Sequence, residues 1–145
     1  MAINSVLGPI DVSDLGTTLI HEHLGIGWNG WEMDYKDFDR KKDGARVTKR
    51  LKEIRELGIK SIVDPCPMEL GRDPVFAAEM SDASGVQVVV ATGLYNDALG
   101  IPLHFRYMDV DGIAEVYVKE IEDGIGKTGI RAGIIKTACG GIHGV

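Results

Sequence analysis

Apolar runs of strand length alternate with helix-like segments along the chain, and this alternation limits the possible folds more than any other feature of the sequence. The runs are expected as strands over residues 17–24, 59–64, 86–92 and 130–138. Helices are expected between them, over 45–57, 73–84 and from Asp109 or Asp111 to 125. Such alternation is typical of parallel strands with right-handed crossovers. The pattern predicts an α/β fold, either a doubly wound sheet or a (β/α) barrel.

Local signals place the ends of several elements. Asp43 is expected to cap the first helix and Gly58 to end it, while Asp73-Pro74 opens the second helix and Gly85 ends it. Ahead of the first strand, Val6–Ile10 is expected as a small hairpin arm that turns at Gly8-Pro9.

Two histidines close the first apolar run, in the sequence Thr18-Leu19-Ile20-His21-Glu22-His23-Leu24. Side chains alternate between the two faces of a strand, so His21 and His23 are expected on one face and Glu22 on the other. Neutral imidazole is a common ligand of divalent metals, so one interpretation is a shared metal ion. The alternative is that one histidine is a hydrogen-bonded core residue and the other lies on the surface.

Polar residues also stand at the carboxyl ends of the other three expected strands. Asp64-Pro65-Cys66-Pro67 follows the second, Thr92-Gly93-Leu94-Tyr95 the third, and Lys136 lies in the fourth. These ends share one edge of a parallel fold, the rim, where such folds place their sites. Lys136 is interpreted as modified or metal-bound, or else as an ordinary lysine that pairs with a carboxylate or reaches solvent. No Gly-x-Gly-x-x-Gly follows the first strand, so a dinucleotide-binding fold has no support.

Composition excludes several classes of function. The 145 residues are 44% hydrophobic and 26% charged, which indicates one globular domain over residues 1–145. A net charge of -6 argues against nucleic-acid binding, and no apolar run is long enough to span a membrane. No signal peptide is visible, and Cys66 and Cys139 form neither a disulfide framework nor a paired zinc motif, so a cytoplasmic location is expected.

Four motifs, in this order, resemble the phosphotriesterase family of the amidohydrolase superfamily. They are His21-Glu22-His23-Leu24, Val63-Asp64-Pro65-Cys66-Pro67-Met68-Glu69-Leu70-Gly71-Arg72-Asp73, Ala91-Thr92-Gly93-Leu94-Tyr95 and Gly133-Ile134-Ile135-Lys136. The resemblance covers essentially the whole chain but only the first half of the family's eight-stranded barrel. It implies a parallel (β/α) half barrel of four strands and three helices.

The resemblance also implies a chemistry. In that family two metals share a centre, so His21 and His23 would bind the more buried metal, and Lys136, carboxylated by carbon dioxide, would bridge both. The metal is expected to be zinc, with cobalt, manganese or iron as alternatives. A metal-bound hydroxide would hydrolyse lactones or organophosphate esters, and Tyr95 would lie near the leaving oxygen.

The family's remaining ligands come from the second half of the barrel, which this sequence does not contain. His104 and His143 do not match those positions and are interpreted as surface residues. Because four strands leave open edges, a homodimer that closes the barrel is expected. Two alternatives stay open: a non-catalytic truncated fragment that folds and self-associates, and a binding module in which Trp28, Trp31 and Tyr35 hold an apolar ligand.

Overall fold

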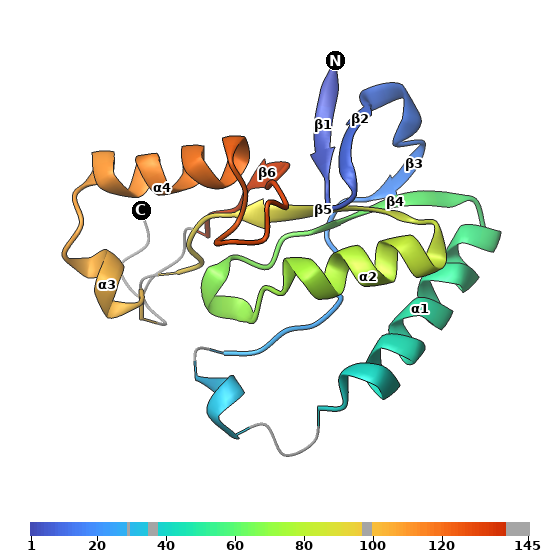
Figure 1. Cartoon of the computed structure of the whole chain (residues 1–145), viewed down its shortest axis with the longest axis horizontal. Helices are drawn as coiled ribbons and strands as arrows, with labels where there is room; N and C mark the ends of the chain where they lie inside the picture. The colour runs from blue at the N-terminus through green and yellow to red at the C-terminus, as the bar shows by residue number, and fades with distance from the viewer. Residues whose placement is uncertain (29, 35–37, 97–99, 139–145) are drawn as a thin grey trace.

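The four expected strands form one parallel sheet. The computed structural model describes residues 1–28, 30–34, 38–96 and 100–138. Its main sheet has the order β3 (Thr17–Leu19), β4 (Ile59–Asp64), β5 (Gln87–Thr92) and β6 (Ile134–Ile135), with every neighbouring pair parallel. Helices α1 (Arg40–Glu56) and α2 (Pro74–Ser84) cover one face of it (Figure 1). This arrangement confirms the predicted parallel (β/α) half barrel.

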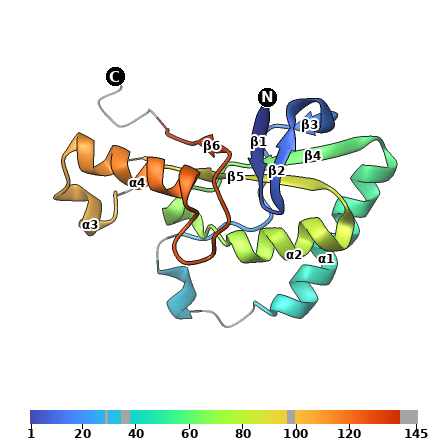
Figure 2. The same ribbon diagram turned by 45° about the horizontal axis from the view of Figure 1, so that its top comes forward.

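The remaining elements complete the first and last parts of the chain. A hairpin of β1 (Ala2–Ser5) and β2 (Gly8–Asp11) lies on the side of the sheet opposite α1 and α2, as both views show (Figures 1 and 2). Helix α4 (Val110–Glu122) packs beside β5, and the short helix α3 (Leu103–Arg106), which was not predicted, precedes it. Within the described residues, three short 3₁₀ helices cover Val12–Asp14, Trp31–Asp34 and Met68–Leu70.

The two outer strands are shorter than predicted. The expected strand over 17–24 is β3 at Thr17–Leu19, and its pairing with β4 shifts register between Thr17 and Thr18. The expected strand over 130–138 is reduced to β6 at Ile134–Ile135. Each has one described neighbour strand, so part of its backbone lacks the ladder bonds that would keep the chain in strand geometry.

The first helix starts earlier than predicted, and its cap is Asp39 and not Asp43. The Asp39 carboxylate accepts hydrogen bonds from the backbone of Lys41 and Lys42, both at 3.0 Å. Asp43 lies in the first turn, where its carboxylate accepts the backbone N–H of Asp39 at 3.1 Å. Asp39 therefore caps the helix, and Asp43 supports the cap by accepting the Asp39 N–H one turn further on.

The hairpin turn also lies elsewhere than predicted. Gly8 and Pro9 pair with Ser5 and Asn4 inside the hairpin, so the chain turns at Val6 and Leu7. The Ser5 hydroxyl donates to the Gly8 carbonyl at 2.7 Å and accepts the Leu7 N–H at 3.3 Å. These serine hydrogen bonds stabilise a turn at Val6 and Leu7, so the chain turns there and not at Gly8-Pro9.

The core lies between β5 and the two helices beneath it. Val86, Val88 and Val90 are almost fully buried, and they face apolar side chains of α1 and α2 such as Leu51 and Phe76. Each buried side chain of this kind contributes about 1.5–3 kcal/mol. The hairpin covers β5 from the other side, where the Val6 N–H donates to the Val88 carbonyl at 2.8 Å. Because β5 is buried on both faces, it fixes where its carboxyl end meets the rim.

Candidate metal centre

The two histidines lie just beyond β3, in chain that still follows β4. The Glu22 N–H between them donates to the Val63 carbonyl at 3.0 Å. The rings of His21 and His23 meet edge to face, with centroids 5.2 Å apart and planes at 78°. Both residues are exposed. The structure therefore brings together the pair that the sequence singled out, with room for a ligand beside them.

The inner side of His23 contacts the last residue of β4 and the segment that follows it. Its Nδ1 lies 2.9 Å from the Cys66 sulfur and 3.5 Å from the Asp64 carboxylate. These three side chains place one candidate ligand atom each within 4.8 Å of one another. The sequence had indicated Asp64 and Cys66 as rim residues but gave neither a role toward His23.

Asp64 and Cys66 are both bound to the chain that carries the histidines. The Asp64 carboxylate accepts the Leu24 N–H at 3.2 Å and the Cys66 N–H at 3.0 Å, and the Cys66 thiol donates to the Gly25 carbonyl at 3.2 Å. Burial, with the Asp64 carboxylate as the next cause, raises the pKa of the Cys66 thiol well above its usual range. Cys66 is therefore a neutral thiol at physiological pH.

Lys136 lies one residue beyond β6, at the same end of the sheet. Its N–H donates to the Thr92 carbonyl at 2.8 Å, which continues the β5–β6 ladder. The residue is half-buried, and within the described chain its amine has no hydrogen bond or ion pair. The carboxylate partner expected of an ordinary buried lysine is therefore not found in that part of the chain. In that part of the chain, no hydrogen bond joins Lys136 to His21 or His23.

The backbone of Lys136 packs closely against Gly93, where a side chain would not fit. The φ of Gly93 is +125°, a conformation that favours glycine, and a Cβ on it would overlap the backbone carbonyl of Lys136. The glycine thus lets the end of β5 pass close to the backbone of Lys136 at the end of β6.

Tyr95 stands on the rim after β5. Its N–H donates to the carboxylate of Glu69, its carbonyl accepts the Ala138 N–H at 2.9 Å, and its ring lies 6.3 Å from that of Trp28. Trp28 and Tyr95 are thus neighbours across two loops of the rim. Tyr35, the third aromatic residue of the binding-module alternative, lies outside the described residues, as do His143 and Cys139; His104 is exposed, as predicted.

A buried ion pair that the sequence analysis did not anticipate supports this end of the sheet. The Arg72 guanidinium donates twice to the Glu120 carboxylate, at 2.6 and 2.8 Å, and once to the Ala91 carbonyl at 2.9 Å. It therefore ties α4 and β5 to the loop after β4. The only sequence signal was the position of Arg72 in the Gly71-Arg72-Asp73 motif.

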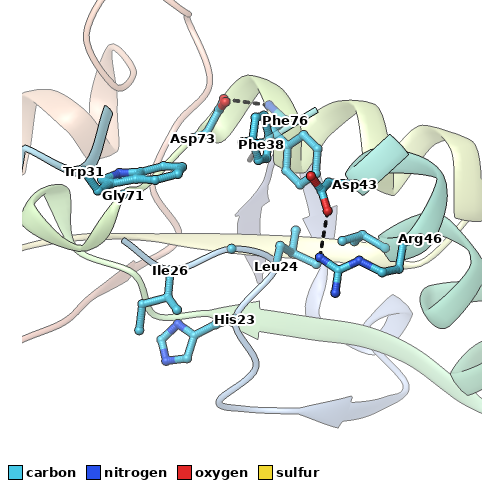
Figure 3. Close-up of a pocket in the computed structure, with 12 residues that line it drawn as sticks. His23, Leu24, Ile26, Trp31, Phe38, Asp43, Arg46, Gly71, Asp73 and Phe76 are labelled. Carbon is cyan, nitrogen blue, oxygen red and sulfur yellow. Dashed lines mark hydrogen bonds and ion pairs between the residues drawn. The ribbon is translucent and has the colours of Figure 1, made fainter. Parts of the chain in front are cut away.

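A cavity of about 420 Å³ opens beside His23, on the side of the helices. Aromatic side chains of the β3–α1 loop and α2 line it, together with the ion pair of Asp43 and Arg46 at 2.9 Å. Figure 3 shows that His23 lies at its edge, away from Phe38 and Phe76. The cavity is therefore adjacent to the histidine pair but mostly apolar, as small-molecule pockets commonly are.

The donor set fits a divalent metal. Two imidazoles meet edge to face, and one of them lies against a carboxylate and a thiol. A half-buried amine without a partner in the described chain lies on the same rim. Imidazole suits zinc, iron and related ions, and ligating histidines usually donate their other N–H to such a neighbour. The set is incomplete as a binuclear centre.

Parallel strands, helices on the outer face and histidines at the rim define this chain as half of a (β/α)-barrel protein. The chain belongs to the phosphotriesterase family, whose sequence profile matches residues 1–143. It is 39% identical over 147 residues to the phosphotriesterase homology protein of Mycobacterium tuberculosis, covering 94% of this chain and 44% of that one. It is 32% identical over 130 residues to the aryldialkylphosphatase of Saccharolobus solfataricus, covering 89% and 41%.

Solved structures agree with the sequence comparison. The organophosphorus hydrolase from Deinococcus radiodurans superimposes with a TM-score of 0.90 at 36% identity, covering 96% of this chain and 44% of that one. A mutant of the PTE-like lactonase from the same organism gives 0.88 at 35% identity, covering 94% and 45%. The chain thus spans less than half the length of these relatives. In the described part of the chain, no helix is both long and apolar enough to cross a membrane.

Proposed function

We propose that this chain forms the metal-binding half of a hydrolase that acts on lactones or organophosphate esters. The observation that carries the proposal is the pair of adjoining imidazoles of His21 and His23, which meet edge to face at the rim. The names of the relatives, an organophosphorus hydrolase and a PTE-like lactonase, support the substrate class. Zinc is the proposed metal, and the cytoplasmic location stays a prediction from the sequence.

Each residue has a proposed role in this site. His21 and His23 hold the metal, and Lys136 supplies a third ligand once its amine is carboxylated. When bound, a divalent metal lowers the pKa of a water molecule and polarises the C=O or P=O group of an ester. Tyr95 is proposed to orient the substrate's leaving oxygen from the loop after β5, beside Trp28.

Carboxylation would explain why the amine of Lys136 has no carboxylate partner in the described chain. The neutral amine adds to carbon dioxide, a nitrogen–carbon bond forms, and one proton is released, which leaves an anionic carbamate. Such a group binds cations and needs no carboxylate partner. Protein incubated with ¹³C-bicarbonate and zinc is expected to show a carbamate carbon resonance that is absent from Lys136→Ala. A spectrum without that resonance would remove Lys136 from the proposed ligands.

Metal content and activity test the proposal together. Purified protein is expected to contain a divalent metal, and His21→Ala is expected to lower that content. Turnover of a lactone or an organophosphate is expected to stop with a chelator and to return with zinc. Replacement of His104, which is exposed and is not one of the proposed ligands, provides the matched control. If metal binds but neither substrate is hydrolysed faster than by zinc in buffer, the chain is the non-catalytic fragment of the alternative hypothesis.

The site also requires ligands from outside the described residues, since two histidines and one lysine do not complete a binuclear centre. We propose that a second copy of this chain supplies them by closing the barrel edge to edge. Ile20, near the β3 edge, is 77% exposed, and Ile135, in the β6 edge strand, is 56% exposed. Exposed apolar side chains at sheet edges favour association.

A further inference from the structure

The inner ring nitrogen of His23 is enclosed by two buried side chains. Cys66 Sγ lies 2.9 Å and Asp64 Oδ1 3.5 Å from Nδ1. Cys66 and Asp64 are only 1% and 7% exposed. The other ring nitrogen, Nε2, has no hydrogen bond within the described part of the chain. The two nitrogens of His23 therefore have different surroundings, which is the condition for one tautomer to be preferred.

Counting protons in this cluster identifies that tautomer. The Cys66 thiol has one proton, and the Gly25 carbonyl, 3.2 Å away, is its acceptor. The sulfur then meets His23 Nδ1 as an acceptor, so Nδ1 must supply the proton. In the reverse arrangement the Nδ1 lone pair would face the Asp64 carboxylate and the Gly25 carbonyl would lose its donor, both of which are unfavourable. The proton therefore belongs on Nδ1.

The same contacts argue against a metal ion inside the cluster. The Asp64 carboxylate already accepts the backbone N–H groups of Leu24 and Cys66. The separation of 2.9 Å between Nδ1 and Sγ is shorter than two ligands of one tetrahedral zinc ion can be, because zinc bonds of about 2.0–2.3 Å keep them more than 3 Å apart. The cluster is therefore a set of hydrogen bonds behind His23.

We infer that Cys66 and Asp64 are positioning residues for His23. They hold its imidazole as the Nδ1–H tautomer, so that the lone pair of Nε2 faces the rim. Asp64 also fixes the chain itself, through its bond to the Leu24 N–H. The inference deepens the proposed function and rests on it in one respect, namely that a divalent metal is what Nε2 binds.

Nitrogen-15 NMR of the metal-free protein tests the tautomer directly. At pH 8 the two-bond ¹H–¹⁵N correlation spectrum is expected to show His23 with a protonated Nδ1 and an unprotonated Nε2. The His23 signals are assigned as those that disappear in His23→Gln. Predominance of the Nε2–H form in the wild type would overturn the inference. This readout needs no metal and no activity.

Variants then test which side chains set the tautomer. Cys66→Ala and Asp64→Asn are each expected to raise the share of the Nε2–H form, whereas Cys66→Ser, which keeps an acceptor, is expected to retain the wild-type form. Ser81→Ala is the matched control, because it removes another buried side-chain hydrogen bond, to the Val86 carbonyl, on α2. An unchanged tautomer in both Cys66→Ala and Asp64→Asn would overturn the positioning role.

Zinc titration by calorimetry separates this inference from the proposed function. Cys66→Ala is expected to bind zinc about 10–100-fold more weakly than the wild type, as is usual when the partner of a ligating histidine is lost, and Ser81→Ala to bind normally. Equal affinity of Cys66→Ala and the wild type would overturn the inference. Failure of the wild type to bind zinc would instead refute the proposed metal site, while the NMR result would still decide the tautomer.

Discussion

At the scale of single residues, the ion pair of Arg72 and Glu120 matters because both charges are buried. Their side chains are 8% and 11% exposed, and two hydrogen bonds join them. Moving two charges out of water costs free energy, so a buried ion pair adds little net stability to the fold. Removing one partner is strongly destabilising, because the other charge stays buried alone. Because Arg72 also bonds the Ala91 carbonyl, the pair keeps α4 against β5 just below the rim.

Glu120→Ala is expected to destabilise the protein by about 3–5 kcal/mol, because it leaves the Arg72 charge buried without a partner. Urea unfolding followed by circular dichroism measures the loss. Glu122→Ala, an exposed change in the same helix, is the control and is expected within about 0.5 kcal/mol of the wild type. A loss for Glu120→Ala no larger than that of the control would contradict the buried-charge argument.

Cys66 is expected to resist thiol reagents in the folded protein. Its sulfur is buried, and the raised pKa of the thiol keeps it protonated, whereas thiolate is the reactive form. In a Cys139→Ser background, a disulfide reagent at pH 8 should react only as fast as the protein opens, and at once in denaturing urea. Rapid labelling of the folded protein would show that the cluster behind His23 is accessible.

What the sequence could predict of the site depends on the kind of interaction. Strand alternation, a local signal, predicted that His21 and His23 lie together; their rings do meet, although β3 ends at Leu19, before both histidines. The contact of His23 with Cys66 joins residues 43 positions apart, so it depends on how two strand ends meet and has no local signal. The same holds for Arg72 and Glu120, 48 positions apart.

At the scale of elements, the buried strands and the sharply bounded helix were predicted well. The bounds of β4 match the prediction, and those of β5 differ from it by one residue. Helix α2 starts at Asp73-Pro74, which provide its cap and first turn, and it ends at Gly85, which adopts the left-handed conformation. The edge strands were predicted too long, because an apolar run shows that a segment is suitable for a strand but not how many ladder bonds its neighbour offers.

Gly93 offers a test of how the ends of β5 and β6 meet. Gly93→Ala is expected to lower the free energy of unfolding by more than the roughly 1–3 kcal/mol due to backbone strain alone. The reason is that the new Cβ would also overlap the Lys136 carbonyl. Gly8→Ala is a matched control, since Gly8 has φ +123° with nothing within 4 Å of the new Cβ. Urea unfolding compares them, and equal losses would show that Lys136 is not held there.

At the scale of the whole molecule, the half barrel has an apolar core on the helix side but open edges at β3 and β6. Helices α1 and α2 cover the outer face, and the hairpin covers only part of the other (Figure 2). Within the described residues no strand pairs with the outer edge of β3 or of β6. Unpaired N–H and C=O groups along an edge, next to exposed side chains such as Ile20 and Ile135, favour another strand.

The 145-residue chain is therefore expected to associate in solution. Light scattering at tens of micromolar should give at least twice the 15.7 kDa of one chain. Ile135→Lys is expected to shift the mass toward the monomer, because a charge on an edge strand opposes pairing, whereas Val118→Lys, at an exposed position of α4, should not. If a copy supplies the missing ligands, zinc bound per chain should fall with Ile135→Lys as the dimer dissociates. A stable wild-type monomer would refute the homodimer, and the rim would then need its remaining ligands from a different polypeptide segment.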